Sequence, residues 1–194
     1  MKEKRLTALF ISSIVAVVAS LAISLGVVFA LADPVAAVGL HEYSFNLTAN
    51  TAKEEIFSPV GYYNGKLDDY NNGVVVNNYD EILYTNEALV DDVKLFKAQV
   101  SNNTGTNARF TFDITVDGET NAKDYVEIAI IDAVTQQIYF VDRTTGKTEE
   151  ITLNADKTGK YVIAAYVTDY NAAERIDLSG YMKLQINVSK INID

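Results

Sequence analysis

Short runs in which apolar and polar residues strictly alternate recur along this 194-residue chain. Between residues 108 and 116, Phe110, Phe112 and Ile114 fall at every second position, with polar residues between them. The run from 181 to 191 begins the same pattern with Met182 and Leu184. A period of two places the apolar side chains on one face of a β-strand, so these runs predict strands with one buried face.

Eight or nine such runs follow one another at short and fairly even spacing, and no long helical period interrupts them. This pattern predicts an all-β fold, an antiparallel β-sandwich of jelly-roll or immunoglobulin-like type. The run 125–131 is more continuously apolar than the others, with Glu127 its one charged residue, and is therefore expected to be a central strand. The expected strands cover residues 40–48, 74–76, 93–101, 108–116, 125–131, 137–141, 148–153, 160–169 and 181–191.

The segments between the strands suggest how they connect. Residues 102–107 have the composition of a hairpin turn or of a crossover between sheets. Residues 142–147, which contain Gly146, predict a hairpin between 137–141 and 148–153. Residues 49–55 are short and polar and are interpreted as a loop with one helical turn.

The first 32 residues predict export. Leu6–Ala32 contains no charged residue, and Met1–Arg5 before it holds three bases and one acid. One interpretation is a signal peptide whose small-x-small cleavage site has Ala30 and Ala32 as its small residues; cleavage after Ala32 would leave Asp33 as the new N-terminus. The other is a retained membrane anchor, because 27 residues form a helix of about 40 Å, enough to cross a hydrocarbon core of about 30 Å.

Both interpretations keep the N-terminus cytoplasmic and place the rest of the chain outside. The expected location is therefore secreted or cell-surface, with a single-pass anchored protein as the alternative. The resulting division is a leader or hydrophobic helix over 1–32, a small-residue linker over 33–39 and a β-sandwich over 40–194. Contact with a membrane is expected only through residues 6–32.

Charge and composition limit the possible partners. Residues 33–194 contain 13 Lys and Arg and 25 Asp and Glu, which argues against binding nucleic acid or anionic lipid head groups. The chain has no cysteine, so it has neither disulfides nor a thiol nucleophile. An exported domain of this kind is expected to depend on its hydrophobic core for stability.

The sequence carries no recognisable catalytic motif. His41 is the only histidine, whereas a zinc enzyme usually draws on several His or Cys ligands, and no H-E-x-x-H or G-x-S-x-G motif occurs. Acidic residues are plentiful, but no particular pair indicates glycoside hydrolysis. We therefore expect a protein that is not an enzyme, with His41 an ordinary residue of the first strand.

Two residue clusters were considered as binding sites. The acids Asp68 and Asp69 resemble a calcium loop in composition but fail the EF-hand spacing, and Asp91 and Asp92 lie near a predicted strand end. Solvated loop acids are the simpler interpretation, so no cofactor is predicted beyond a structural calcium ion as an alternative. The tyrosines could form a contact surface for a carbohydrate or protein, or instead cover one end of the sandwich; they are Tyr62, Tyr63, Tyr70 and Tyr79.

Three features together resemble a known family. They are the leader that ends in SLGVVFALAD, the acidic cysteine-free β domain behind it, and the segment LFKAQVSNNTGTNARFTFDITV, with a turn between two strands. This combination resembles the TasA/camelysin family, which the SipW-type signal peptidase exports in Gram-positive bacteria. The resemblance implies a jelly-roll domain, processing by a signal peptidase and a role as a subunit of biofilm-matrix fibres. The metallopeptidase activity described for camelysins is not supported by a chain with one histidine.

The resemblance also implies self-association into filaments by donor-strand addition, in which one subunit's N-terminal segment completes the sheet of its neighbour. The residues placed for this are Val35, Val38, Leu40, Tyr43, Phe45 and Leu47. The alternative is that residues 40–47 pair within their own domain. The first functional hypothesis is thus a non-enzymatic structural protein of the cell surface or matrix. The second is a membrane-anchored β-sandwich that binds a glycan or a protein.

Overall fold

The computed structural model describes residues 35–36, 39–49, 51–58, 74–84, 92–168 and 178–191. The chain divides into two compact units, Met1–Pro34 and Val35–Asp194, and only the second is described. Val35 and Ala36 therefore belong to the same unit as the sandwich. The predicted leader and its cleavage site, with Ala30, Ala32 and Asp33, lie outside the described residues. No helix in the described part of the chain is long and apolar enough to cross a membrane.

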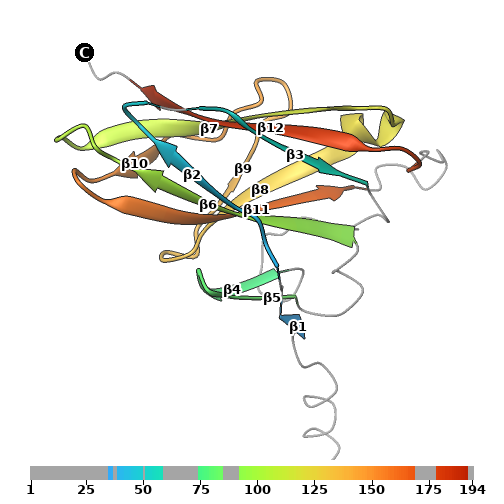
Figure 1. The fold of residues 1–194 in the computed structure, drawn as a ribbon, viewed down its shortest axis with the longest axis horizontal. Coiled ribbons are helices and arrows are strands. Elements are labelled where there is room, and N and C mark those ends of the chain that lie inside the picture. Colours follow the sequence, from blue (N-terminus) through green and yellow to red (C-terminus); the bar gives the residue numbers. More distant parts are fainter. Residues whose placement is uncertain are drawn as a thin grey trace, which may run out of the picture. The chain divides into compact units, whose positions relative to one another are not determined.

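Two sheets, in which most strand pairs are antiparallel, face each other in this unit (Figure 1), which confirms the predicted β-sandwich. The five-stranded sheet has the order β2-β6-β11-β8-β9 and the four-stranded sheet the order β10-β7-β12-β3. The strands of the first are β2 (Glu42–Asn46), β6 (Val93–Ser101), β11 (Thr158–Val167), β8 (Val126–Asp132) and β9 (Ile138–Phe140). Those of the second are β10 (Ile151–Leu153), β7 (Ala108–Gly118), β12 (Met182–Ile191) and β3 (Lys53–Phe57).

The main core lies between these two sheets and uses the alternating residues. Phe110 and Phe112 of β7 and Tyr161 of β11 are almost fully buried. Their rings meet edge to face, with centroids 5.2 Å apart for Phe112 and Tyr161 and 6.0 Å apart for Phe110 and Tyr161. Edge-to-face packing adds to the free energy gained by burying aromatic surface. The period of two in the sequence thus corresponds to the contact between the sheets.

A small third sheet covers the outer face of the five-stranded sheet. It has the order β1-β5-β4 and consists of β1 (Val35–Ala36), β5 (Glu81–Tyr84) and β4 (Val74–Asn78). Buried side chains of the β4–β5 hairpin pack with residues such as Val162 and Ile131 in a second core cluster. Strands β8 and β11 are therefore buried on both faces, which explains their continuous apolar runs.

The connection between β6 and β7 crosses from one sheet to the other and is organised by Asn102. The Asn102 side chain is fully buried. Its Nδ2 donates to the carbonyls of Thr106 (2.8 Å), Leu153 (2.9 Å) and Asn154 (3.0 Å). Its Oδ1 accepts from the backbone N and the hydroxyl of Thr104, at 3.1 and 2.7 Å. One amide thus fixes the crossover against the loop that follows β10.

Two local predictions were wrong. Residues 137–141 and 148–153 do not form a hairpin, because β9 pairs with β8 whereas β10 pairs with β7 in the opposite sheet. Residues 49–55 contain no helical turn, because their second half begins β3, which pairs with β12. Each outcome depends on a partner strand distant in sequence, which local turn composition does not reveal.

Asn102 provides a direct test of the crossover. Replacing Asn102 by Ala leaves three buried or half-buried carbonyls without their donor, so we expect the free energy of unfolding to fall by about 2–4 kcal/mol. Urea denaturation of residues 33–194 measures this change. The matched control is Asn103→Ala at the neighbouring exposed position, which should change stability by less than about 0.5 kcal/mol. Equal effects at the two positions would contradict this role of Asn102.

Candidate functional site

The N-terminal part of the described chain adds strands to two sheet edges. We call residues 35–47 the N-terminal arm. Its first strand, β1, pairs with β5 through Val35 and Ala36 opposite Tyr84 and Leu83. Its second strand, β2, lies at the edge of the five-stranded sheet and runs parallel to β6. Among the strands of the described residues, each strand of the arm therefore has a pairing partner on one side only.

The arm makes its contacts within its own domain in this structure. Phe45 and Leu47 are buried in the main core, with 3% and 7% of their surface exposed, and Tyr43 packs against them at the rim. Leu40 packs against the second cluster. The alternative that residues 40–47 pair within their own domain is thus the arrangement observed. Val38 lies outside the described residues, and donation of the arm to another copy remains a prediction.

A carboxylate of the opposite sheet holds the arm in place. The Glu55 side chain of β3 points inward and is 14% exposed, and its Oε2 accepts hydrogen bonds from the Tyr43 hydroxyl and from Nδ1 of His41, the latter at 2.9 Å. The hydrogen bond and charge of Glu55 raise the pKa of His41. Burial, and then the Glu55 hydrogen bond, raise the pKa of Tyr43. We call this group the Glu55 clasp, because it links edge strands β2 and β3.

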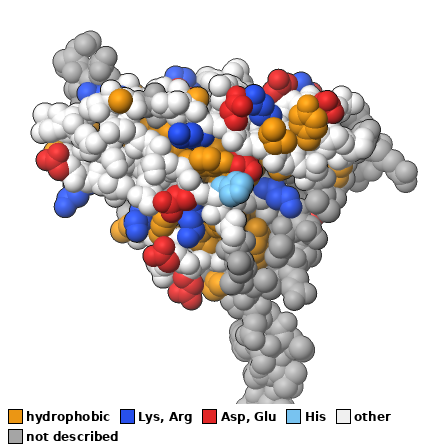
Figure 2. Space-filling model, in the orientation of Figure 1, with side chains coloured by type: hydrophobic (Ala, Val, Ile, Leu, Met, Phe, Trp, Pro, Cys, Tyr) orange, Lys and Arg blue, Asp and Glu red, His pale blue; other side chains and the backbone are white. Residues whose placement is uncertain are grey.

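The Glu55 clasp lies at the edge of the sandwich, where β2 and β3 are edge strands. His41 is 68% exposed and lies on the surface, where the single histidine appears in pale blue (Figure 2). Neither of the cavities described below is lined by its three residues. His41 immediately precedes β2, one residue outside the strand, and its ring connects this part of the arm to Glu55 of β3.

The Glu55 clasp predicts a pH-dependent contribution to stability. Because the pKa of His41 is raised in the folded state, its contribution is complete below the unfolded pKa of about 6.5 and is lost as pH rises through the higher folded pKa. The stability difference between the native chain and His41→Gln should thus be larger at about pH 5.5 than at about pH 9. Chemical denaturation at both pH values measures it. A difference that does not vary with pH would contradict the His41–Glu55 pair.

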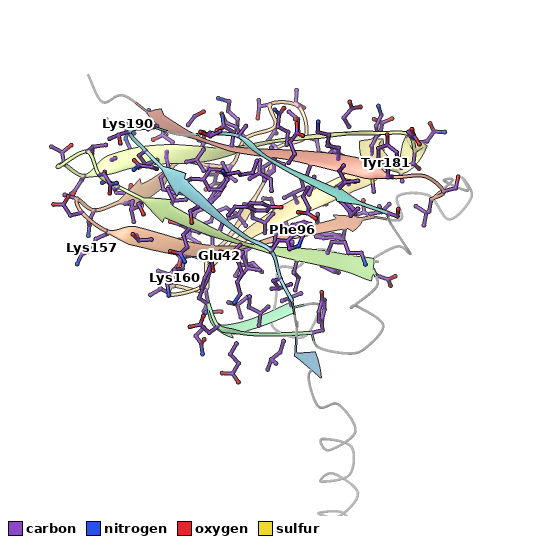
Figure 3. All side chains as sticks on the ribbon, in the orientation of Figure 1. Glu42, Phe96, Lys157, Lys160, Tyr181 and Lys190 are labelled. Atoms are coloured by element: carbon purple, nitrogen blue, oxygen red, sulfur yellow. The ribbon has the colours of Figure 1, made fainter. Side chains whose placement is uncertain are left out.

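The prediction that Tyr79 contributes to an exposed ligand surface is wrong. Only 5% of Tyr79 is exposed. Nζ of Lys97 and Nζ of Lys160 each lie over its ring, at 4.9 and 5.0 Å from the ring centroid. Burial, followed by the nearby Glu42 carboxylate, raises the pKa of its hydroxyl. Glu42 and Lys160 lie on the side of the five-stranded sheet that the β4–β5 hairpin covers (Figure 3), so Tyr79 fastens the hairpin to the sheet.

The other binding candidates lie mostly outside the described part of the chain. Tyr62, Tyr63 and Tyr70 do so, as do Asp68, Asp69 and Asp91. Asp92 immediately precedes β6. Among the described residues, no three His, Asp or Glu side chains are grouped to hold a metal ion. A structural calcium ion remains a prediction.

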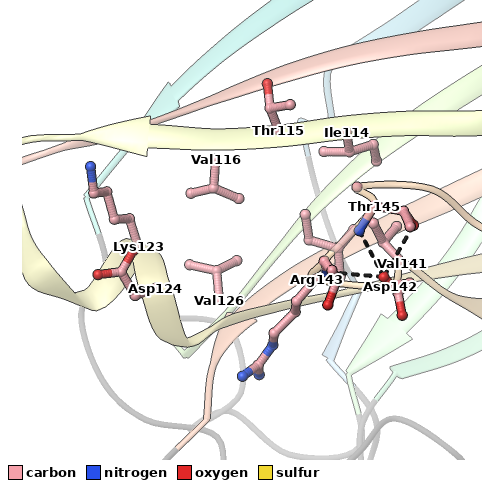
Figure 4. Close-up of a pocket in the computed structure, with 13 residues that line it drawn as sticks. Ile114, Thr115, Val116, Lys123, Asp124, Val126, Val141, Asp142, Arg143 and Thr145 are labelled. Atoms are coloured by element: carbon pink, nitrogen blue, oxygen red, sulfur yellow. Dashed lines mark hydrogen bonds between the residues drawn. The ribbon is translucent and has the colours of Figure 1, made fainter.

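A cleft that the sequence did not predict opens between β7 and β8. It has a volume of about 360 Å³ and is closed at one end by the helix η1 (Asn121–Tyr125) and at the other by the loop 142–146 (Figure 4). Its floor is formed by five aliphatic side chains, those of Ile114, Val116, Val126, Ile128 and Val141. A second cavity, of about 630 Å³, lies on the other side of the same loop, next to Phe140.

The loop beside the cleft is built on Asp142. Its Oδ1 accepts from the backbone N of Thr144 (2.9 Å) and Thr145 (2.7 Å), and from the Thr145 hydroxyl (3.1 Å). These bonds, the backbone bond from Thr145 first, lower the pKa of Asp142. Gly146 then approaches β7 closely, since its carbonyl accepts from the N of Ile114 at 2.7 Å. The D-x-T-T-G sequence signalled this turn, but no local signal showed that the turn walls a cleft.

No protein-family model and no curated protein sequence matches this chain. Among solved structures, the periplasmic inhibitor of g-type lysozyme PliG from Salmonella Typhimurium is 9% identical, over 77% of this chain and 98% of that chain, with a TM-score of 0.34. PliG from Aeromonas hydrophila is 10% identical, over 79% and 100%, with a TM-score of 0.32. Likeness at this level assigns neither a family nor a function to this chain, and the resemblance to the TasA/camelysin family remains a prediction.

Proposed function

We propose that this chain is an exported, non-catalytic structural protein of the cell surface or extracellular matrix that self-associates into filaments through its N-terminal arm. The observation that carries this proposal is the position of β2. It is the N-terminal, outermost and parallel strand of a sheet whose other pairings are antiparallel. Its removal would interrupt no other strand pair of that sheet.

Strand addition follows from this position because all contacts of β2 can be supplied by another copy. An arm from a second molecule would bury the same Phe45 and Leu47 and would reach the same Glu55 carboxylate. The free energies of the closed and exchanged forms then differ mainly by the geometry of the hinge, as in domain swapping. The hinge in this case is the short connection that follows residue 47 and joins β2 (Glu42–Asn46) to β3 (Lys53–Phe57).

Location and partners complete the proposal. The leader implies a signal peptidase as the processing partner, and contact with the membrane only through residues 6–32 in a chain that keeps them. The excess of acidic residues disfavours nucleic acid as a partner. The second candidate function, an anchored β-sandwich that binds a ligand, is favoured by one observation, the aliphatic cleft between β7 and β8.

Disulfide trapping can test arm exchange, since the chain has no cysteine of its own. Ser44 of β2 lies opposite Gln99 of β6, so the double variant Ser44→Cys, Gln99→Cys joins the arm to its acceptor sheet on oxidation. In residues 33–194 at high concentration, we expect ladders of linked chains on non-reducing gels. Negative-stain microscopy and sedimentation of the same preparation should show filaments of regular width.

The control is the pair Ser101→Cys, Thr158→Cys, which links β6 to β11 where the two native hydroxyl oxygens are 3.0 Å apart. Because neither residue belongs to the arm, this pair should give only internally linked monomers. Internal linkage alone for the Ser44 and Gln99 pair, in a sample that stays monomeric, would overturn the proposal. Filaments that persist after deletion of residues 33–39 would remove that segment from the mechanism.

A further inference from the structure

On the cleft side of β7, the neighbouring segments form backbone hydrogen bonds with only part of the strand. β10 pairs with residues 108–110. The loop that follows Asp142 comes next, because Thr148 N donates to the Phe112 carbonyl (3.0 Å) and Ile114 N to the Gly146 carbonyl (2.7 Å). Beyond Ile114, no described residue continues this row of hydrogen bonds.

The alternation of backbone groups identifies the open positions. In an antiparallel strand, residues that point their N–H and C=O toward a given neighbour recur every two positions. The bonded N–H and C=O groups of Phe112 and Ile114 point toward the cleft side, so the N–H and C=O groups of Val116 must do the same. Within the described part of the chain, the Val116 N–H and C=O and the Ile114 C=O have no strand beside them. An edge of this kind can pair with the backbone of an added strand.

The side chains around these open groups favour one kind of occupant. The floor of the cleft is aliphatic, and the cleft has a volume of about 360 Å³. This space suits a few side chains of the size of Val rather than aromatic rings. Open backbone groups above such a floor match an extended peptide, whose alternate residues would point down into it. A rigid small molecule could fill the floor but would leave the backbone groups of β7 unpaired.

The charged side chains at the rim of the cleft indicate which charge the end residues of a bound peptide should carry. Lys123 lies 3.5 Å from Asp117, and Arg143 lies 3.2 Å from Glu127, so both basic residues of the cleft already have an acidic partner. Asp124 and Asp142, at the two ends of the cleft, face no basic group within salt-bridge distance in the described residues. The lowered pKa of Asp142 keeps its carboxylate charged.

We propose that the cleft between β7 and β8 binds an extended segment of a partner protein, which adds as a strand to β7 at Val116. The segment carries small aliphatic residues at alternate positions and Lys or Arg at its ends. This inference concerns binding to another protein and does not depend on exchange of the N-terminal arm. It gives the second candidate function a site and a class of ligand.

The probe for the test is the capped peptide KSVTVSK, titrated into residues 33–194 and followed by amide NMR. We expect saturable binding, and slower hydrogen exchange of the Val116 amide in the complex. The same peptide N-methylated on one alternate set of residues should lose binding, whereas N-methylation of the other set should not, because only one set faces β7. A peptide with Glu in place of both Lys should bind more weakly.

Variants of the protein locate the site. Val116→Pro removes the open N–H without touching the bonds of β7 to β12, and should weaken binding about tenfold. Asp124→Asn with Asp142→Asn should weaken it about threefold to tenfold and reduce its dependence on salt, while Asn at 142 preserves the turn acceptor. The matched control is Asp156→Asn, an exposed acid of the β10–β11 turn, which should leave the affinity unchanged.

Three outcomes would overturn the proposal. They are no binding of the probe up to about 1 mM, binding that Val116→Pro leaves intact, and protection of amides at β2 or β3 in place of Val116. The amide spectrum of each variant shows whether it is folded. If Val116→Pro does not fold, the pair of N-methylated peptides on the native protein decides the question, and equal binding of the two would reject strand addition.

Discussion

The packing of one apolar sheet face against another is the interaction on which the rest of this structure depends. The chain has no cysteine, so no disulfide limits the unfolded state. The rings of Phe110, Phe112 and Tyr161 interlock between the sheets, and β11 is buried on both of its faces. Every edge strand, loop and clasp is held in position only because this core fixes the two sheets relative to each other.

The edge strands at the two flanks of the sandwich differ in length and in how they are held. At one flank, β2 and β3 lie at the edges of opposite sheets, and the Glu55 carboxylate joins them through Tyr43 and His41. At the other flank, β9 and β10 are only three residues long, and they leave part of β7 uncovered. An uncovered edge tends to pair with another chain, and the two proposals made above both rest on this property of sheet edges.

Two polar side chains shape the connections at which the chain changes sheets. The buried Asn102 holds the crossover from β6 to β7, and the exposed Asp142 shapes the turn that carries the chain from β9 back toward β7. Each accepts or donates several hydrogen bonds with backbone groups of its own connection. The turn at Asp142 also forms one wall of the cleft, so the same residue shapes both the connection and the cleft.

The sequence by itself determined the fold class and the long strands. The alternation in β7, β11 and β12 is a local property, because a strand with one buried face needs an apolar residue at every second position whatever its neighbours are. The acidic charge, the absence of cysteine and the single histidine likewise reduced the range of partners and reaction types expected for the chain. Tertiary structure alone decided that β9 and β10 join different sheets, that Tyr79 is buried beneath two lysines and that Val116 faces an open cleft. These features depend on which distant segments meet, and a pattern of neighbouring residues carries no information about that choice.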